Sequence, residues 1–105
     1  MSKAKIITMC GSLKFIDEIK FNTERLALEG NCVLSIIYPT KENEDKYTAH
    51  DYELLGILHK QKIEMSDAIF VVNVNGYIGN STRNEIEYAK SLNKEVLYLV
   101  TNIEN

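Results

Sequence analysis

The chain reads AIFVVNVNGYIGNSTRNEIEYA from Ala68 to Ala89. An apolar run opens this stretch, a polar loop with two glycines follows, and the loop leads into a helix-like pattern that carries Glu85. A strand, a loop and a helix in this order are typical of α/β proteins, in which backbone amides at the start of a helix face the carboxyl end of a parallel sheet. The stretch therefore predicts an edge at which a small anionic ligand can bind.

The rest of the chain alternates between short apolar runs and longer amphipathic segments, which is the rhythm of βαβ units. The pattern predicts strands at 5–10, 32–38, 68–74 and 95–101, and helices at 13–29, 51–65 and 83–92. Right-handed crossovers then give a parallel sheet of about four strands in the order 2-1-3-4. The expected fold is a single three-layer α/β domain of the Rossmann-like or flavodoxin-like class.

Burial is expected at several of these elements. The strand at 32–38 is apolar and β-branched enough to be buried on both faces. The first helix has an apolar stripe of Phe15, Ile16, Ile19, Leu26 and Ala27, and the second is expected to turn Leu54, Leu55, Leu58 and Met65 inward. The polar segment 40–50 is interpreted as a solvated connection, with a lid as the alternative.

Composition limits the function. The 105 residues fit one domain, with 26% charged and 45% hydrophobic residues. A net charge of -3 argues against a polymeric nucleic-acid partner, which requires clustered Lys and Arg, but leaves a small nucleotide possible. No apolar stretch approaches the length of a membrane span and no secretory apolar region is present, so we expect a cytoplasmic protein without a membrane partner.

The two cysteines, Cys10 and Cys32, are interpreted as small core residues. Neither belongs to a CxxC motif, and no His lies at ligand spacing from them. The sequence therefore predicts no disulfide framework and no metal site, and we expect no cofactor.

In the predicted sheet the turn 10–13 and the loop 75–82 face each other across a crevice between the first and third strands. Gly11 allows a sharp turn and a close approach of the backbone to a ligand. Ser12 either caps the first helix or donates to a phosphate oxygen at its N-terminus. Asn73 and Asn75 are interpreted as turn formers.

Glu85 has two interpretations from spacing alone. Thr82 and Glu85 fit a capping box, in which the glutamate reaches back to the amide of the N-cap residue. Glu85 also shares a helical face with Tyr88, Ala89 and Leu92, a face expected to meet the sheet. On the second interpretation the carboxylate points into the crevice.

The segment Asn84-Glu85-Ile86-Glu87-Tyr88-Ala89, one strand and one loop after Ser66-Asp67-Ala68, resembles the glutamate-bearing helix start of nucleoside 2-deoxyribosyltransferases and of the related deoxynucleoside monophosphate N-glycosidases. The Gly11-Ser12 turn fits the same superfamily, and the resemblance covers most of residues 5–100. It implies a single domain of this type over residues 1–105, assembly as a homodimer or higher homo-oligomer, and a role for Glu85 as the nucleophile that attacks the sugar C1′.

The resemblance also implies ligand contacts. Gly79 stands where the transferases have an aspartate, a residue that the monophosphate N-glycosidases also lack; those enzymes place small phosphate-binding residues in this loop, a role that Ser81 and Thr82 would take here. His59 stands at the position of a second family aspartate, so it is a candidate sugar or phosphate contact, with a half-buried surface histidine as the alternative. The expected substrate-binding residues are Gly11, Ser12, His59, Asn75, Gly76, Tyr77, Gly79, Ser81 and Thr82. Tyr77 and Tyr38 are candidates to stack on a base or to act as local packing anchors.

The favoured function is that of an enzyme that cleaves, or transfers at, the N-glycosidic bond of a nucleoside or, preferentially, a (deoxy)nucleoside 5′-monophosphate. A carboxylate can stabilise or trap the oxocarbenium-like centre that develops in this reaction. The alternative is a non-catalytic sensor or sequestering protein for nucleotides on the same scaffold. A third possibility is an interaction module with a vestigial crevice.

Overall fold

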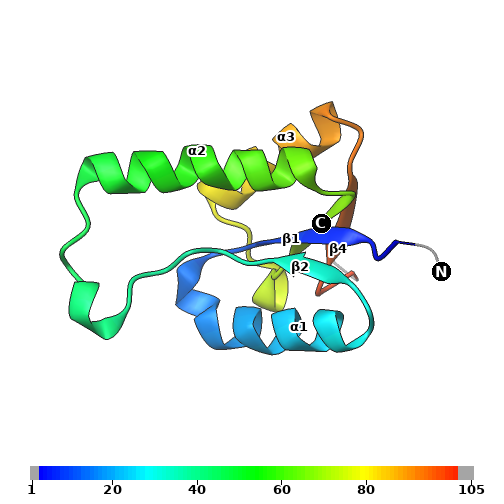
Figure 1. The fold of residues 1–105 in the computed structure, drawn as a ribbon, viewed down its shortest axis with the longest axis horizontal. Coiled ribbons are helices and arrows are strands. Elements are labelled where there is room, and N and C mark those ends of the chain that lie inside the picture. Colours follow the sequence, from blue (N-terminus) through cyan, green and yellow to red (C-terminus); the bar gives the residue numbers. More distant parts are fainter. Residues whose placement is uncertain (1–2, 102–105) are drawn as a thin grey trace.

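The computed structural model describes residues 3–101 of the chain. It is an α/β domain with one parallel sheet of four strands in the order β2-β1-β3-β4, which confirms the predicted topology. The strands are β1 (Ile6–Cys10), β2 (Cys32–Leu34), β3 (Ala68–Val71) and β4 (Glu95–Tyr98). Helix α1 (Ile16–Leu28) covers one face of the sheet, and α2 (Ala49–Met65) and α3 (Asn80–Ser91) cover the other, so the domain has three layers (Figure 1).

The core lies on both faces of the central strands, because successive side chains of a strand point to opposite sides. On the side of α1 the buried cluster consists of Ile7, Met9, Ile19, Leu26, Ala68, Phe70 and Val72. On the side of α2 and α3 it consists of Cys10, Ile63, Ile69, Val71, Ile86 and Ala89. Every residue of β3 is buried, which makes β3 the most enclosed strand of the sheet. The prediction that Cys10 is a core residue is confirmed, since its side chain is inaccessible to solvent.

The second strand differs from its prediction. Residues 32–38 were expected to form a strand buried on both faces, but β2 contains only three residues and none of them is buried. The reason is its place at the edge of the sheet, where it pairs with β1 alone. For the same reason Cys32 is exposed, so its interpretation as a core residue is wrong.

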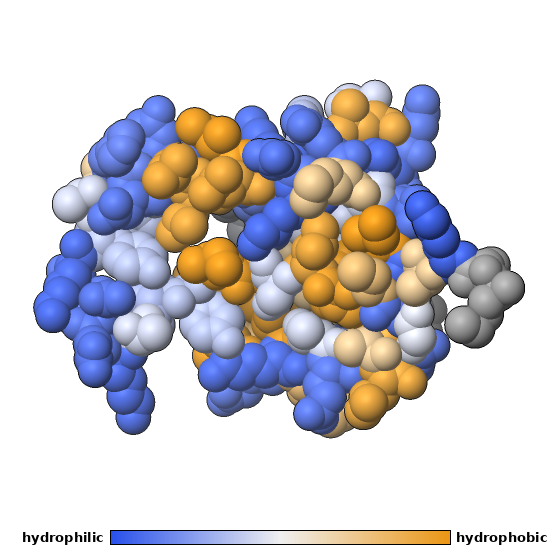
Figure 2. All heavy atoms as spheres, viewed as in Figure 1, coloured by the Kyte–Doolittle hydropathy of each residue, from blue (hydrophilic) through white to orange (hydrophobic). Residues whose placement is uncertain are grey.

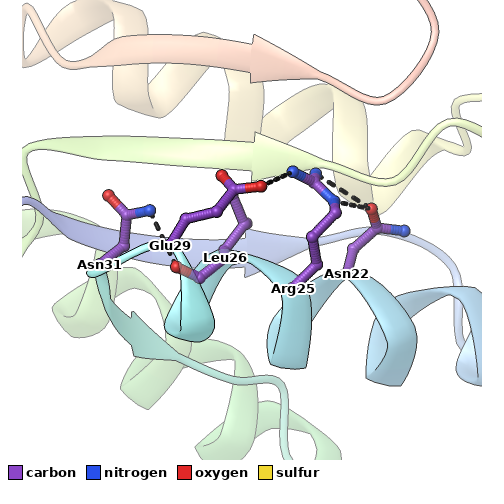
Figure 3. Close-up of polar contacts among 5 residues, drawn as sticks. All are labelled: Asn22, Arg25, Leu26, Glu29 and Asn31. Atoms are coloured by element: carbon purple, nitrogen blue, oxygen red, sulfur yellow. Dashed lines mark hydrogen bonds and ion pairs between the residues drawn. The ribbon is translucent and has the colours of Figure 1, made fainter.

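Hydrogen bonds between neighbouring residues define the two ends of α1. Ser12 caps a short 3-10 turn (Leu13–Phe15) ahead of α1 by accepting a hydrogen bond from the Lys14 amide. The predicted capping role thus applies to this turn and not to α1 itself, whose N-cap residue Phe15 makes no side-chain capping bond. At the other end Gly30 is in the left-handed region (φ 100°), and the amides of Gly30 and Asn31 donate back to the carbonyls of Ala27 and Leu26, the pattern of a Schellman motif. The Asn31 side chain also donates to the Leu26 carbonyl, and Arg25 bridges Asn22 and Glu29 (Figure 3). Ala27 was predicted to belong to the apolar stripe of this helix, but it is exposed because it lies on the solvent side of the last turn.

Helix α2 begins two residues before its predicted start. Thr48 and Asp51 form a reciprocal capping box at Ala49, a signal that the sequence pattern alone did not single out. The helix turns His59 and Ile63 inward, whereas Leu54, Leu58 and Met65 are exposed, so the predicted inward face is wrong for these three residues. The error has a physical cause: α2 carries apolar residues on both of its sides, so periodicity does not distinguish the inner side from the outer one.

Among residues 3–101 no helix combines the length and the apolar character that crossing a bilayer requires.

A buried asparagine joins the ends of β3 and β4. Asn73 is inaccessible to solvent, its amide nitrogen donates to the Val100 carbonyl (3.1 Å), and its amide oxygen accepts from the Val100 amide (2.9 Å). Asn73 is therefore a clamp between two chain segments, which is a larger role than the turn former that the sequence predicted.

Replacing Asn73 with Ala is expected to lower the free energy of unfolding by about 2 kcal/mol or more, because two backbone groups of Val100 lose their buried partner. Urea unfolding measures the change. Asn84→Ala is the matched control: Asn84 is exposed on α3, so its loss is expected to change stability by no more than about 0.5 kcal/mol. Equal effects of the two substitutions would contradict the clamp.

Candidate functional site

A pocket opens at the carboxyl end of β1, between the segment that follows β2, helix α2 and the start of α3. Its volume is about 200 Å³. Figure 2 shows the molecule hollowed beneath α2, beside the segment that leads from β2 to α2. The walls are Gly11, Leu13, Ile36, Ile37, Pro39, Tyr47, Tyr52, Leu55, Gly56, Leu58, His59, Lys62, Ser81 and Glu85. Four residues singled out from the sequence, Gly11, His59, Ser81 and Glu85, therefore line one cavity.

Gly11 forms the inner corner of this pocket. A Cβ atom at Gly11 would lie 3.2 Å from the Val72 carbonyl oxygen and 3.3 Å from the Val72 Cβ, closer than side chains normally pack. The absence of a side chain thus lets the turn after β1 lie directly against the end of β3, whereas the predicted close approach of this backbone to a ligand stays a prediction.

Three reactive side chains meet beside the pocket: His59 and Glu85 line it, whereas Cys10 is fully buried and is not among its walls. Cys10 is the last residue of β1, His59 comes from the inner side of α2, and Glu85 comes from α3. The Cys10 Sγ lies 3.5 Å from the His59 Nε2, and the His59 Nε2 lies 3.8 Å from the Glu85 Oε1. Sequence spacing could not show this trio, because its members belong to three elements and only the fold brings them together.

Glu85 does not cap its helix. Helix α3 starts at Asn80, three residues before its predicted start, and Gly79 is the N-cap residue with no side-chain capping bond. Glu85 therefore lies in the second turn of the helix, and the capping-box interpretation of Thr82 and Glu85 is wrong. The Glu85 side chain is 20% exposed and faces the pocket, as the alternative interpretation predicted.

Burial controls the charges of the trio. Loss of solvent raises the pKa of Glu85 to about 7, and the Cys10 thiol and the Lys60 charge oppose this increase only in part. Burial lowers the pKa of His59 to about 4, and the nearby Lys62 contributes in the same direction. Burial and the Glu85 carboxylate together raise the pKa of Cys10 well above its ordinary value.

These pKa values mean that the contact between His59 and Glu85 is not an ion pair. His59 becomes charged only below about pH 4, where Glu85 is protonated, and Glu85 becomes charged around pH 7, where His59 is neutral. The ionised carboxylate therefore has no charged partner in contact with it among residues 3–101.

Sequence reasoning missed the aromatic wall of the pocket. Tyr47 and Tyr52 pack together with ring centroids 5.5 Å apart, and both line the cavity. Tyr47 lies in the segment 40–50, so the interpretation of that segment as a purely solvated connection is wrong at this residue. The available signal was a pair of tyrosines on either side of a helix start.

Sequence reasoning also missed Lys62. Its ammonium group donates to the Ser35 carbonyl (2.7 Å) and holds the segment that follows β2 against α2.

Six residues expected to bind substrate lie outside the walls of this pocket: Ser12, Asn75, Gly76, Tyr77, Gly79 and Thr82. Asn75 and Gly76 adopt positive φ angles of 54° and 81°, and Asn75 is thus a turn former as expected. Tyr77 packs edge-on against Phe15 (5.8 Å between ring centroids) and beneath the Lys14 ammonium, which makes it a local packing anchor. Thr82 is buried. Tyr38 likewise lies outside the walls and contacts Lys20.

A scan against models of protein families and a search of the curated proteins found no match for this chain. The fold places the trio at the carboxyl edge of a parallel sheet, beside the topological switch point between β1 and β3. Open α/β sheets bind their ligands at such a point.

Glu85→Gln is expected to stabilise the protein in a pH-dependent way. The unfolded chain ionises Glu85 near pH 4.5, whereas the folded protein keeps the proton to about pH 7. Between these values the folded state binds more protons, so the Glu85 contribution to wild-type stability falls as the pH rises. The gain of the variant over wild type should be small at pH 4 and approach about 3 kcal/mol at pH 8.

Chemical unfolding of the two proteins across this pH range measures the gain. Glu87→Gln, an exposed position on the same helix, is the control and should change stability by about 0.5 kcal/mol or less. A gain for Glu85→Gln that is the same at pH 4 and pH 8 would show that the carboxyl group titrates as it does in the unfolded chain.

Proposed function

We propose that the protein cleaves the N-glycosidic bond of a nucleoside or, preferentially, a nucleoside 5′-monophosphate, with Glu85 as the nucleophile. One observation carries this proposal: the Glu85 carboxylate faces a small apolar and aromatic pocket, is largely shielded from solvent, and among residues 3–101 is bound neither to a cation nor to a helix end. A buried carboxylate without such a partner costs stability, and uncompensated costs of this kind are concentrated at functional sites.

The pocket walls suit a nucleoside. Tyr47 and Tyr52 offer aromatic surfaces on which a base can stack, and Ile36 and Leu13 supply apolar contacts around it. The polar side chains of His59 and Glu85 in the same walls are then available to the sugar. This arrangement supports Glu85 at C1′ and a hydrogen bond from a sugar hydroxyl to the neutral imidazole of His59.

The reaction proceeds in two steps, formation of a glycosyl ester on Glu85 and its hydrolysis. The ionised Glu85 attacks C1′ and forms an ester, while the electron pair of the C1′–N bond leaves with the base, which takes a proton from solvent. Water then adds to C1′, releases its proton to solvent and frees the carboxylate; a second base in place of water gives transfer. With a pKa of about 7, about half of the Glu85 side chains are ionised at neutral pH.

The start of α3 supports recognition of a phosphate. Its N-cap residue, Gly79, has no side-chain capping bond, so the first amides of the helix remain available to an anion, and Ser81 in the first turn lines the pocket. Lys60 lies beside Ser81 and Glu85 on the adjoining surface and adds a positive charge there.

A monophosphate is therefore expected to bind more tightly than its nucleoside by about 1 to 3 kcal/mol, the range of new charge-assisted hydrogen bonds. Calorimetry measures both affinities. Ser81→Ala should narrow the difference, whereas Ser91→Ala at the other end of α3 should leave it unchanged. Equal affinities of wild type for the two ligands would remove phosphate from the proposal.

A second copy of the chain is the protein partner that we propose. Leu54, Ile57, Leu58 and Met65 are exposed on α2, where Figure 2 shows a patch of apolar atoms, and Tyr52 is exposed in the first turn of the same helix. An exposed apolar stripe of this kind is typical of an interface. Leu58 and Tyr52 also line the pocket, so a second copy on this side would reduce its opening to solvent.

Glu85→Gln is expected to release base at least about a hundredfold more slowly than wild type, a barrier increase of about 2.7 kcal/mol, while still binding nucleotide. The amide carries no charge and cannot form the ester intermediate. Chromatography of free bases from a panel of nucleosides and monophosphates measures the rate, with Glu87→Gln as the control. Base release that survives in Glu85→Gln would refute the nucleophile.

One feature favours the non-catalytic alternative. Among the pocket walls Glu85 is the only acidic residue, so no second carboxyl group is available to protonate the leaving base. If wild type binds a nucleotide, raises its melting temperature with it and releases no base from any compound in the panel, a sensor or sequestering protein becomes the better description.

A further inference from the structure

The trio of Cys10, His59 and Glu85 has a property that the glycosidic reaction does not use. It combines a thiol, an imidazole and a carboxylate, and the ligand atoms of Cys10, His59 and Glu85 all lie within 4.8 Å of one another. Cys10 and His59 are buried, and Glu85 is mostly buried. Sulfur, nitrogen and oxygen donors of these three kinds are those that zinc binds in proteins.

Two of the three distances are close to those between ligand atoms that share one ion. Zinc bonds of about 2.3 Å to sulfur and about 2.0 to 2.2 Å to nitrogen and oxygen place tetrahedral ligand atoms about 3.3 to 3.7 Å apart. The Cys10 Sγ to His59 Nε2 distance is 3.5 Å, and the His59 Nε2 to Glu85 Oε1 distance is 3.8 Å. The Cys10 and Glu85 ligand atoms lie within 4.8 Å of each other, so side-chain rotation has to shorten this separation before all three atoms can share one centre.

We propose that Cys10, His59 and Glu85 form a binding site for a divalent ion of the zinc class, with a fourth coordination position open to the pocket. A thiolate and a carboxylate neutralise the two charges of the ion, so the buried site gains no net charge when it binds. The thiol proton and any carboxyl proton are released to solvent. Three protein ligands with one open position are typical of zinc sites that exchange a small ligand.

This inference goes beyond the proposed glycosidic reaction and sets a limit on it. A carboxylate oxygen coordinated to a metal cannot attack C1′, so the metal-bound and the nucleophilic forms of Glu85 exclude each other. The ion would therefore inhibit base release. Metal binding is measured without any substrate, so its failure and the failure of the proposed reaction are separate results.

Cobalt(II) titration is the direct test, because a cobalt–thiolate bond gives a charge-transfer absorption band that oxygen and nitrogen ligands do not give. Wild type should show this band, and zinc should displace the cobalt and abolish it. The second cysteine provides a matched control: Cys32→Ser should keep the band, since Cys32 is exposed on β2 and far from the trio in the fold, whereas Cys10→Ser should lose it. Circular dichroism checks that both variants fold.

If Cys10→Ser does not fold, Glu85→Gln provides a second test of the metal site, because Glu85→Gln is expected to be more stable than wild type. It should weaken zinc binding about a hundredfold or more, while Glu87→Gln should not weaken it. Three results would overturn the site: no thiolate band in wild type, a band that disappears in Cys32→Ser, or unchanged zinc affinity in Glu85→Gln.

Discussion

The pairing of β1 with β3 is the constraint on which the rest of the structure depends. Cys10 stands opposite Val71, and the Val72 amide donates to the Cys10 carbonyl (2.9 Å), so the two strands end side by side. Gly11 makes this possible because a side chain there would press on Val72. Helices α2 and α3 pack on the face of the sheet to which Cys10 points, and their inner sides therefore deliver His59 and Glu85 to the same place.

Much of this could be predicted from the sequence. Apolar periodicity and the glycine after the first strand were enough for the strand order and for the turn at Gly11, because both depend on local patterns. The helical face of Glu85 allowed a position in the pocket, but spacing fitted a helix cap equally, and only the observed start of α3 at Asn80 distinguishes the two. The inner side of α2, however, was not predictable, since the helix is apolar on both sides and turns His59 inward while Leu54 and Leu58 face solvent. The place of Cys10 in the trio and of Tyr47 in the pocket wall could not be predicted either. Both depend on contacts between segments that are far apart in the sequence, and the spacing of residues within one segment does not reveal such contacts.

Burial of Glu85 links stability to function. The fold accepts a carboxyl group whose ionisation is unfavourable in the folded state, and the same desolvation leaves the ionised oxygen a stronger base and a less solvated nucleophile. Neutral His59 contacts the carboxyl group without neutralising it. The proposed reaction and the proposed metal site both use the Glu85 carboxylate, so a proton, a sugar carbon and a metal ion would compete for it.

Mass spectrometry of a trapped intermediate tests the central claim, that Glu85 forms a covalent bond to the sugar, most directly. A nucleoside monophosphate with fluorine at C2′ slows breakdown of the ester, because fluorine destabilises the oxocarbenium-like transition state through which the ester is hydrolysed. The account predicts that the protein gains the mass of one sugar phosphate and that peptide mapping places it on the peptide containing Glu85. Release of base with no adduct, or an adduct on a different residue, would contradict it.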